Sequence, residues 1–244
     1  MPQNTPLYIV TSQHPRVGKT LISRLLIEFF RGSDRAVAGY DLDPREPTLA
    51  ALFPNNVTTV DIAETPGQMA LFDQLIADSW RTTVIDLAHG KSEQFFTVMS
   101  EIGFEREARR RLMKPVVLFI ADSAPATAKR YAELRALLPD TALVPVHNEA
   151  ASFMLIEHDF PPSRRDLGKL HIPRLSPIVR GVIDRPGFSF AAYLAKPQPG
   201  GPTEIHSWIA DIFAQFRELE LRLLLGELEL TLRSAVRAAG GGRG

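Results

Sequence analysis

The chain of 244 residues contains no cysteine, which excludes disulfide bonds, thiolate metal sites and cysteine nucleophiles. It also lacks an excess of either charge, because 28 basic residues balance 28 acidic ones. No overall field therefore draws it to nucleic acid or to an anionic membrane. No apolar run is long enough to span a bilayer, and residues 1–10 lack the charged start and apolar core of a signal peptide. We expect a cytoplasmic protein with no membrane among its partners.

What the chain does contain is an alternation of two kinds of segment. Its length and its 45% hydrophobic content suffice for one domain with a well-buried core. Short runs rich in branched or aromatic residues predict strands at 7–11, 36–42, 57–62, 82–87, 115–121, 142–147 and 170–175. Amphipathic segments between them predict helices at 19–31, 66–80, 92–102 and 124–138. This alternation predicts a three-layer α/β fold with a mainly parallel sheet.

The last third of the chain is organised differently. Residues 158–190 are rich in proline and arginine, which predicts irregular chain with short helices around one strand. The Pro- and Gly-rich segment 195–202 reads as a linker that closes a domain over 1–202. A long C-terminal helix is predicted over 203–238, and we expect the Gly-rich tail 239–244 to be disordered.

The predicted C-terminal helix carries two apolar stripes. The first is the usual face by which a last helix packs on its own domain, and consists of Ile205, Trp208, Ile209, Ile212, Phe213, Phe216, Leu219 and Leu223. The second lies on another side and consists of Leu221, Leu224, Leu225, Leu228 and Leu232. The charges around it are balanced, which favours a protein contact over a basic membrane anchor. We expect self-association or partner docking through the second stripe; the alternative is that both stripes are buried within the chain.

A phosphate-binding loop is indicated near the N-terminus. Gly18, Lys19 and Thr20 follow a predicted strand and open a predicted helix, which is the context of a P-loop. In such a loop main-chain N–H groups and the helix N-terminus face an anion, the lysine reaches the terminal phosphates and the hydroxyl ligates Mg²⁺. The loop is degenerate, because a regular P-loop has glycine at the position of Gln13 and because Pro15 removes one N–H donor. If position 13 needs a positive φ, glutamine there costs on the order of 1–2 kcal/mol.

Acidic residues follow two other predicted strands. Asp41 and Asp43 stand at the end of the second run, and Asp86 ends the fourth. Ligands of open parallel sheets bind outside the carboxyl ends of the strands. We therefore expect these three carboxylates to converge on the mouth of the loop.

With these segments in order, residues 7–195 resemble the ParA/MinD-type P-loop ATPases. Residues 11–20, "TSQHPRVGKT", resemble the deviant Walker A of that family, in a degenerate form. Residues 41–53, "DLDPREPTLAALF", resemble its switch I segment, and 84–90, "VIDLAHG", its Walker B. Residues 142–150 resemble the strand that ends in an adenine-reading asparagine, and 172–194 the closing stretch of the family.

The resemblance implies roles for individual residues. The loop residues that would bind ATP or ADP are His14, Pro15, Arg16, Val17, Gly18, Lys19, Thr20 and Leu21, with Asn148 on the adenine edge. For Mg²⁺, Thr20 would be a direct ligand, Asp86 would act through water and Asp41 would give support. Lys19 would contact phosphate and Asp43 would position the attacking water.

The most consequential departure from the family is His14. It stands where the family has a signature lysine that reaches across an ATP-sandwich dimer. Imidazole is mostly neutral at pH 7 and cannot replace a permanent cation. Arg16 is permanently charged, and our hypothesis is that it supplies the missing charge within the chain or across a dimer. The alternative is a solvated arginine on the loop of an ATPase that has lost its activity.

Two basic segments raise the question of DNA. Residues 105–114 and 164–185 are rich in arginine and lysine, and non-specific DNA binding needs little more than a basic patch. The alternative is a pair of ordinary solvated faces.

Three functions compete at this stage. The first is a ParA/MinD-like switch with ATP-dependent homodimerisation, weak ATP hydrolysis and a macromolecular cargo, such as DNA to be partitioned. The second is a non-hydrolysing binding or scaffold protein that works through its C-terminal helix. The third is an ATP-dependent ligase like the dethiobiotin synthetases, which the partitioning-type segment at 41–53 disfavours.

Overall fold

The computed structural model describes residues 5–151, 160 and 167–240, with side chains up to residue 226 in the last helix. Within this part of the chain one sheet has the strand order β3-β2-β4-β1-β5-β6-β7, and every neighbouring pair is parallel. The strands are β1 (Thr5–Ser12), β2 (Val37–Asp41), β3 (Val57–Thr59), β4 (Thr82–Asp86), β5 (Met113–Ala121), β6 (Ala142–Asn148) and β7 (Leu170–Ile172). All seven predicted strands are confirmed.

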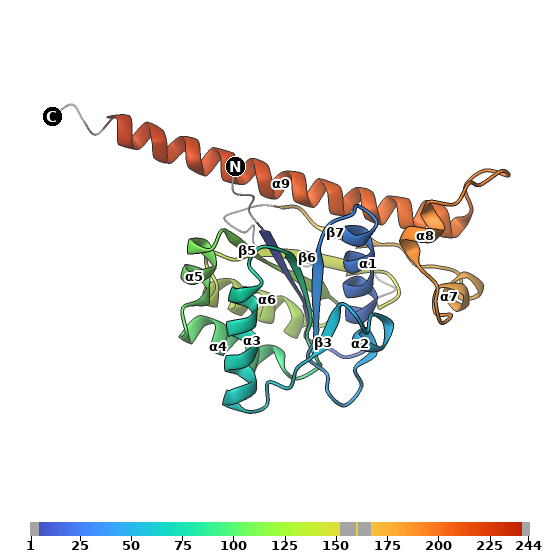
Figure 1. Ribbon diagram of the computed structural model, residues 1–244, viewed down its shortest axis with the longest axis horizontal. Helices are drawn as coiled ribbons and strands as arrows, with labels where there is room; N and C mark the ends of the chain where they lie inside the picture. Colours follow the sequence, from blue (N-terminus) through green and yellow to red (C-terminus); the bar gives the residue numbers. More distant parts are fainter. Residues whose placement is uncertain (1–4, 152–159, 161–166, 241–244) are drawn as a thin grey trace.

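Helices cover both faces of this sheet (Figure 1). They are α1 (Lys19–Arg31), α2 (Thr48–Leu52), α3 (Thr65–Ala77), α4 (Ser92–Glu101), α5 (Phe104–Arg110), α6 (Pro125–Leu137), α7 (Pro177–Ile183), α8 (Phe190–Leu194) and α9 (Glu204–Gly240). The four predicted helices are confirmed, α1 with its predicted bounds. The short helices α2 and α5 were not predicted, whereas α7 and α8 are the short helices expected around β7.

The alternation of side chains along the central strands divides the core into two layers. In β1, Tyr8 and Val10 join a cluster with α1, α8 and α9, while Leu7 and Ile9 join a cluster with α3 to α6. Successive side chains of a strand point to opposite faces, so a strand covered on both faces is apolar at every position. The predicted three-layer α/β fold is confirmed.

A buried ion pair attaches the closing segment of the chain to α1. Arg24 lies 3.3 Å from the Glu28 carboxylate and donates to the main-chain oxygens of Ile183, at 2.8 Å, and Phe188. Glu28 in turn accepts from the Ser189 hydroxyl at 2.6 Å. Because both buried charges have hydrogen-bond partners, their desolvation is compensated, and the pair fixes α7 and α8 against the helix that follows the phosphate loop.

Helix α9 packs on this body with its first stripe only. All eight residues of the first stripe are buried, and Trp208 donates its indole N–H to the Pro173 oxygen at 2.7 Å. Leu221, Leu224 and Leu225 of the second stripe are half exposed, so the alternative of complete burial within the chain is wrong at these positions. The side chains of Leu228 and Leu232 and the tail residues 241–244 lie outside the described residues. None of the described helices is both long and apolar enough to cross a bilayer.

Candidate functional site

The strand order brings the predicted site residues to one edge of the sheet. β1 lies between β4 and β5. The chain runs from β1 to β2 on one side of β1, and the connection after β4 crosses β1 to reach β5 on its other side. Such a reversal opens a crevice at the carboxyl ends of the strands. In the sheet register Asp86 is opposite both Val10 of β1 and Asp41 of β2. The loop after β1 and two of the three predicted acids therefore meet at this edge.

Gly18 forms the turn from the loop into α1. Its backbone is left-handed, with φ 96° and ψ 21°, a conformation that favours glycine. A Cβ atom at this position would lie 2.4 Å from the Asn148 side-chain nitrogen. Both the conformation and the close approach require glycine, and they place the first amides of α1 at the crevice.

The strain predicted for Gln13 falls on a different residue. Among the described residues Gln13 does not have a positive φ, whereas Arg16 has φ 59°. A left-handed conformation costs a non-glycine residue on the order of 1–2 kcal/mol. The side chain of Arg16 is exposed, as is that of Pro15, while Val17 is buried in the core. Arg16 is therefore the strained and accessible cation of the loop.

Lys19 is held back over the loop. Its ammonium donates to the Ser12 hydroxyl at 3.4 Å, and Ser12 donates to the His14 main-chain oxygen at 2.7 Å. Burial lowers the pKa of Lys19, while the nearby charges of Asp86 and Asp43 oppose this shift. Within the described residues no carboxylate lies within ion-pair distance of Lys19, so its charge is available to an anion.

Asp86 is a buried carboxylate that lacks part of its hydrogen bonding. In the described part of the chain its Oδ1 atom has no hydrogen-bond partner. Burial, aided by the charge of Asp41, raises the pKa of Asp86 to about 7 against the opposing effects of Thr20 and Lys19. A buried acceptor without a partner costs free energy, and it lies beside a hydroxyl and an ammonium. These residues fit a Mg²⁺ ion with phosphate, which would complete the bonding of the carboxylate.

The metal would depend on the nucleotide for ligands. Within the described residues no group of three or more His, Asp or Glu side chains could hold a metal ion. Magnesium usually keeps several waters and binds through one or two carboxylates together with substrate phosphates. The arrangement of Thr20 and Asp86 is therefore typical of a metal that arrives with its phosphates.

Asp41 and Asp43 have different surroundings. The buried Asp41 carboxylate accepts the main-chain N–H groups of Leu49 and Ala50, at 2.8 and 3.1 Å, and of Asp43. It thereby anchors the start of α2 to the sheet. Burial nevertheless raises its pKa. Its role in Mg²⁺ binding stays a prediction.

Asp43 lies at the rim of the same edge. Its carboxylate accepts the main-chain N–H groups of Arg45 and Glu46. It also lines a cavity of about 450 Å³, together with the rest of segment 42–46 and with Asp61, Ala63, Ala88, His89 and Lys91. The cavity gives room for a water beside Asp43, and its role in positioning that water stays a prediction.

His14 contacts an acidic residue that was not among the predicted site residues. Its Nδ1 atom makes a short contact with the carboxylate of Asp122, which follows β5. Burial raises the pKa of Asp122, but hydrogen bonds from Thr127, Ala124 and His14 outweigh it and hold the pKa below its ordinary value. Asp122 could have been found as another acid at a strand end. His14 is thus fixed against β5.

Asn148 braces the loop from β6. Its amide donates to the Val17 main-chain oxygen at 2.8 Å and accepts the Ala150 N–H at 3.2 Å. The Asn148 side chain is buried. Leu21, in the first turn of α1, is partly buried and packs against the core. This bracing explains why an asparagine ends β6, while its reading of adenine stays a prediction.

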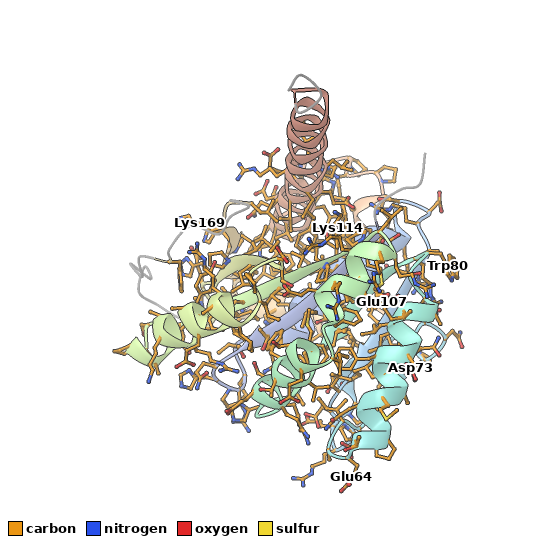
Figure 2. The ribbon with its side chains drawn as sticks, turned by 90° about the vertical axis from the view of Figure 1, so that its left-hand side faces the viewer. Glu64, Asp73, Trp80, Glu107, Lys114 and Lys169 are labelled. Carbon is orange, nitrogen blue, oxygen red and sulfur yellow. The ribbon has the colours of Figure 1, made fainter. Side chains whose placement is uncertain are left out.

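Several arginines of the basic segments are paired with acids. Arg109 contacts Asp140, and Arg110 and Arg111 contact Glu107 at 3.5 and 3.0 Å. In Figure 2 Lys114 lies above Glu107, on the side toward α9. Arg164 and Arg165 lie outside the described residues. DNA binding by these segments stays a prediction.

Comparison with known proteins supports the fold. No protein-family model matches the sequence, and no curated protein does. The cell division protein MinD of Aquifex aeolicus matches with a TM-score of 0.51 at 13% identity, over 87% of this chain and 97% of that one. MinD in its complex with MinC, from the same organism, matches with a TM-score of 0.52 at 12% identity, over 87% and 96%. The chain therefore has the fold of MinD, as the ParA/MinD resemblance implied.

A nucleotide-binding protein of Archaeoglobus fulgidus, solved in complex with ADP, also matches, at 16% identity. It covers 61% of this chain and 68% of its own, with a TM-score of 0.41. That similarity is too weak to support a conclusion.

Proposed function

We propose that the chain is an ATP-binding switch that takes Mg²⁺-ATP at the loop 13–20, forms a homodimer through that edge when ATP is bound, hydrolyses ATP slowly and positions a macromolecular cargo. The observation that carries the proposal is the buried Asp86 oxygen without a partner, beside Thr20 and Lys19. A purely structural aspartate would have its acceptors filled.

The residues divide the work of binding. Gly18 and the first amides of α1 face the phosphates, and Lys19 loses its weak contact with Ser12 to neutralise them. Thr20 and Asp86 would hold the Mg²⁺ ion, which supplies positive charge to the phosphate oxygens when bound. Asp43 lines the cavity at this edge, where it would orient water for attack on the terminal phosphate.

Arg16 completes the site in this proposal. Its guanidinium is exposed at the edge of the sheet, whereas His14 is committed to Asp122. A permanent cation on an exposed and strained loop is placed to reach the phosphates of a second copy. Positive charge at the transferring phosphate speeds phosphoryl transfer strongly in related chemistry.

A second candidate is a pseudo-ATPase that binds nucleotide without hydrolysis and acts as a scaffold through α9. It is favoured by the replacement of the family's signature lysine by His14, which is held by an acid of its own chain. In this case the exposed leucines of α9 are the working surface.

Two measurements separate these candidates. Calorimetric titration with ATP, ADP and GTP in the presence of Mg²⁺ tests binding and base preference. Phosphate release under single-turnover conditions tests hydrolysis, with Arg16→Ala beside the wild type. Binding with turnover that Arg16→Ala abolishes supports the switch, and binding without turnover supports the scaffold. No binding of any nucleotide would overturn both.

A further inference from the structure

The outer part of α9 projects from the body of the protein. α9 runs from Glu204 to Gly240, which is about 55 Å at 1.5 Å per residue. Figure 1 shows it passing beyond the sheet at its carboxyl end, and Figure 2, viewed from that end, shows it clear of the elements below. Leu223 is the last buried residue of α9 whose side chain is described. Short isolated helices are marginal in water, so this segment needs a partner to persist.

An apolar side faces solvent where α9 leaves the domain. Leu221, Leu224 and Leu225 are 50%, 54% and 51% exposed. They are neighbours on one side of the helix, and they continue the second stripe of the sequence. Clustered exposed leucines on a projecting helix mark an interaction surface.

The spacing of this side indicates a coiled coil. Leucines stand at 221, 225, 228 and 232, and alanines continue the series at 235 and 239. The steps are four, three, four, three and four residues, the 3.5-residue repeat of a coiled-coil seam. Such a seam packs against a helix that carries the same 3.5-residue repeat. A second copy of α9 carries this repeat.

The flanking charges select an antiparallel second copy. With Leu221 opposite Leu232 and Leu225 opposite Leu228, four layers of the seam pair leucine with leucine. In this register Arg222, which flanks the seam, lies beside the flanking Glu229 of the second copy. The twofold symmetry of the dimer forms the same pair a second time. A parallel pairing over the same residues would set Leu224 beside Glu229 and Thr231 beside Val236, without any ion pair. Within its own chain Arg222 also pairs with Glu218 at 2.9 Å.

The seam and the phosphate loop lie at different edges of the sheet. Arg35, which precedes β2, forms an ion pair with Glu220 at 2.5 Å and so places this part of α9 at the amino ends of the strands. Lys19 and Asp86 lie at the carboxyl ends. A contact through the seam therefore leaves the nucleotide edge open.

We propose that two copies of this chain pair through an antiparallel coiled coil of residues 221–232, without nucleotide. The occupant of the exposed seam is thus a second copy rather than a membrane or another protein. This pairing does not depend on ATP binding, so it can hold if the proposed function fails. If both hold, ATP would join these pairs into larger assemblies.

Light scattering during gel filtration tests the pairing in nucleotide-free buffer. The expected mass is twice the 27.1 kDa of the chain. A double variant, Leu221→Asp with Leu225→Asp, should elute as a monomer that loses no more circular dichroism than the outer turns of α9 contribute, because both side chains are exposed and the domain core is unchanged. The matched control Met69→Asp changes an apolar residue that is 61% exposed on α3, and it should remain a dimer. A monomeric wild type, a dimer only with ATP, or a dimeric double variant would overturn the proposal.

Disulfide cross-linking tests the orientation, since the chain contains no cysteine of its own. Leu221→Cys and Leu232→Cys are placed on differently tagged copies that are co-expressed and then oxidised. The antiparallel pairing predicts cross-links between the two tags and none within a preparation of either single variant. Cross-links of Leu221→Cys to itself would show parallel helices and overturn the antiparallel assignment.

Discussion

The two edges of the sheet are incomplete in opposite ways. At the carboxyl edge a buried carboxylate oxygen of Asp86 lacks a hydrogen-bond partner. At the amino edge α9 leaves the body with Leu221 and Leu225 uncovered. A buried polar group without a partner is satisfied by a small charged ligand, whereas an exposed apolar face is covered by the surface of another macromolecule. The carboxyl edge is therefore suited to a small ligand, and the amino edge to another protein chain.

The largest effect is expected from removing the phosphate-facing charge. Lys19→Ala should weaken ATP binding on the order of 100-fold, because a charge-assisted bond at a partly buried site is lost. Calorimetric titration measures this change. Lys129→Ala, which removes an exposed lysine of α6, is the control and should bind ATP like the wild type. Equal affinities of the two variants for ATP would show that Lys19, and with it the carboxyl edge of the sheet, does not bind the nucleotide.

Gly18→Ala tests the shape of the loop. The added Cβ atom would meet the Asn148 amide at 2.4 Å, and the left-handed backbone disfavours alanine. We expect a loss of about 2 kcal/mol in the free energy of unfolding. Thermal and urea denaturation report this loss. The control Gly181→Ala lies in α7 with open space around it and should not destabilise the protein.

The pH dependence of stability tests the burial of Asp86. Because its pKa is raised to about 7 in the folded chain, the folded state holds a proton that the unfolded state has released between about pH 4 and pH 7. The wild type should therefore lose stability as the pH rises through this window. Asp86→Asn should remove this loss, because the amide does not titrate. Urea denaturation between pH 4 and pH 8 measures it, and parallel curves for both proteins would contradict the assignment.

The smallest effect concerns Arg16. Arg16→Gly should stabilise the chain by about 1 kcal/mol, because glycine adopts φ 59° without strain. The same change should slow ATP turnover if the guanidinium acts on phosphate. Asp34→Gly relieves a similar backbone strain at φ 53° away from the loop, so it should stabilise without changing turnover. Identical turnover in both variants would remove Arg16 from the mechanism.

Much of the fold follows from local pattern. The helix 19–31 was predicted with its bounds because glycine precedes it and its apolar face is regular. The short α2 escaped prediction because five residues give no period to read. The small edge strand β3 is shorter than its apolar run, since it pairs on one side only.

The site was predicted in outline but not in its supports. Asp86 and Lys19 could be placed because the strand, loop and helix order gives them meaning. The bond between His14 and Asp122 joins residues 108 positions apart, and the brace from Asn148 to Val17 joins residues 131 positions apart. Pairings at such separations depend on the packing of β5 and β6 beside β1, which no local motif encodes. For the same reason the strain fell on Arg16 and not on Gln13.

The magnesium dependence of ATP binding tests the central claim most directly. ATP is titrated into the wild type and into Asp86→Asn, each with and without Mg²⁺. We expect Mg²⁺ to tighten binding to the wild type and to give no such gain in Asp86→Asn. A wild type that does not bind ATP, or an equal gain from Mg²⁺ in both proteins, would contradict the account.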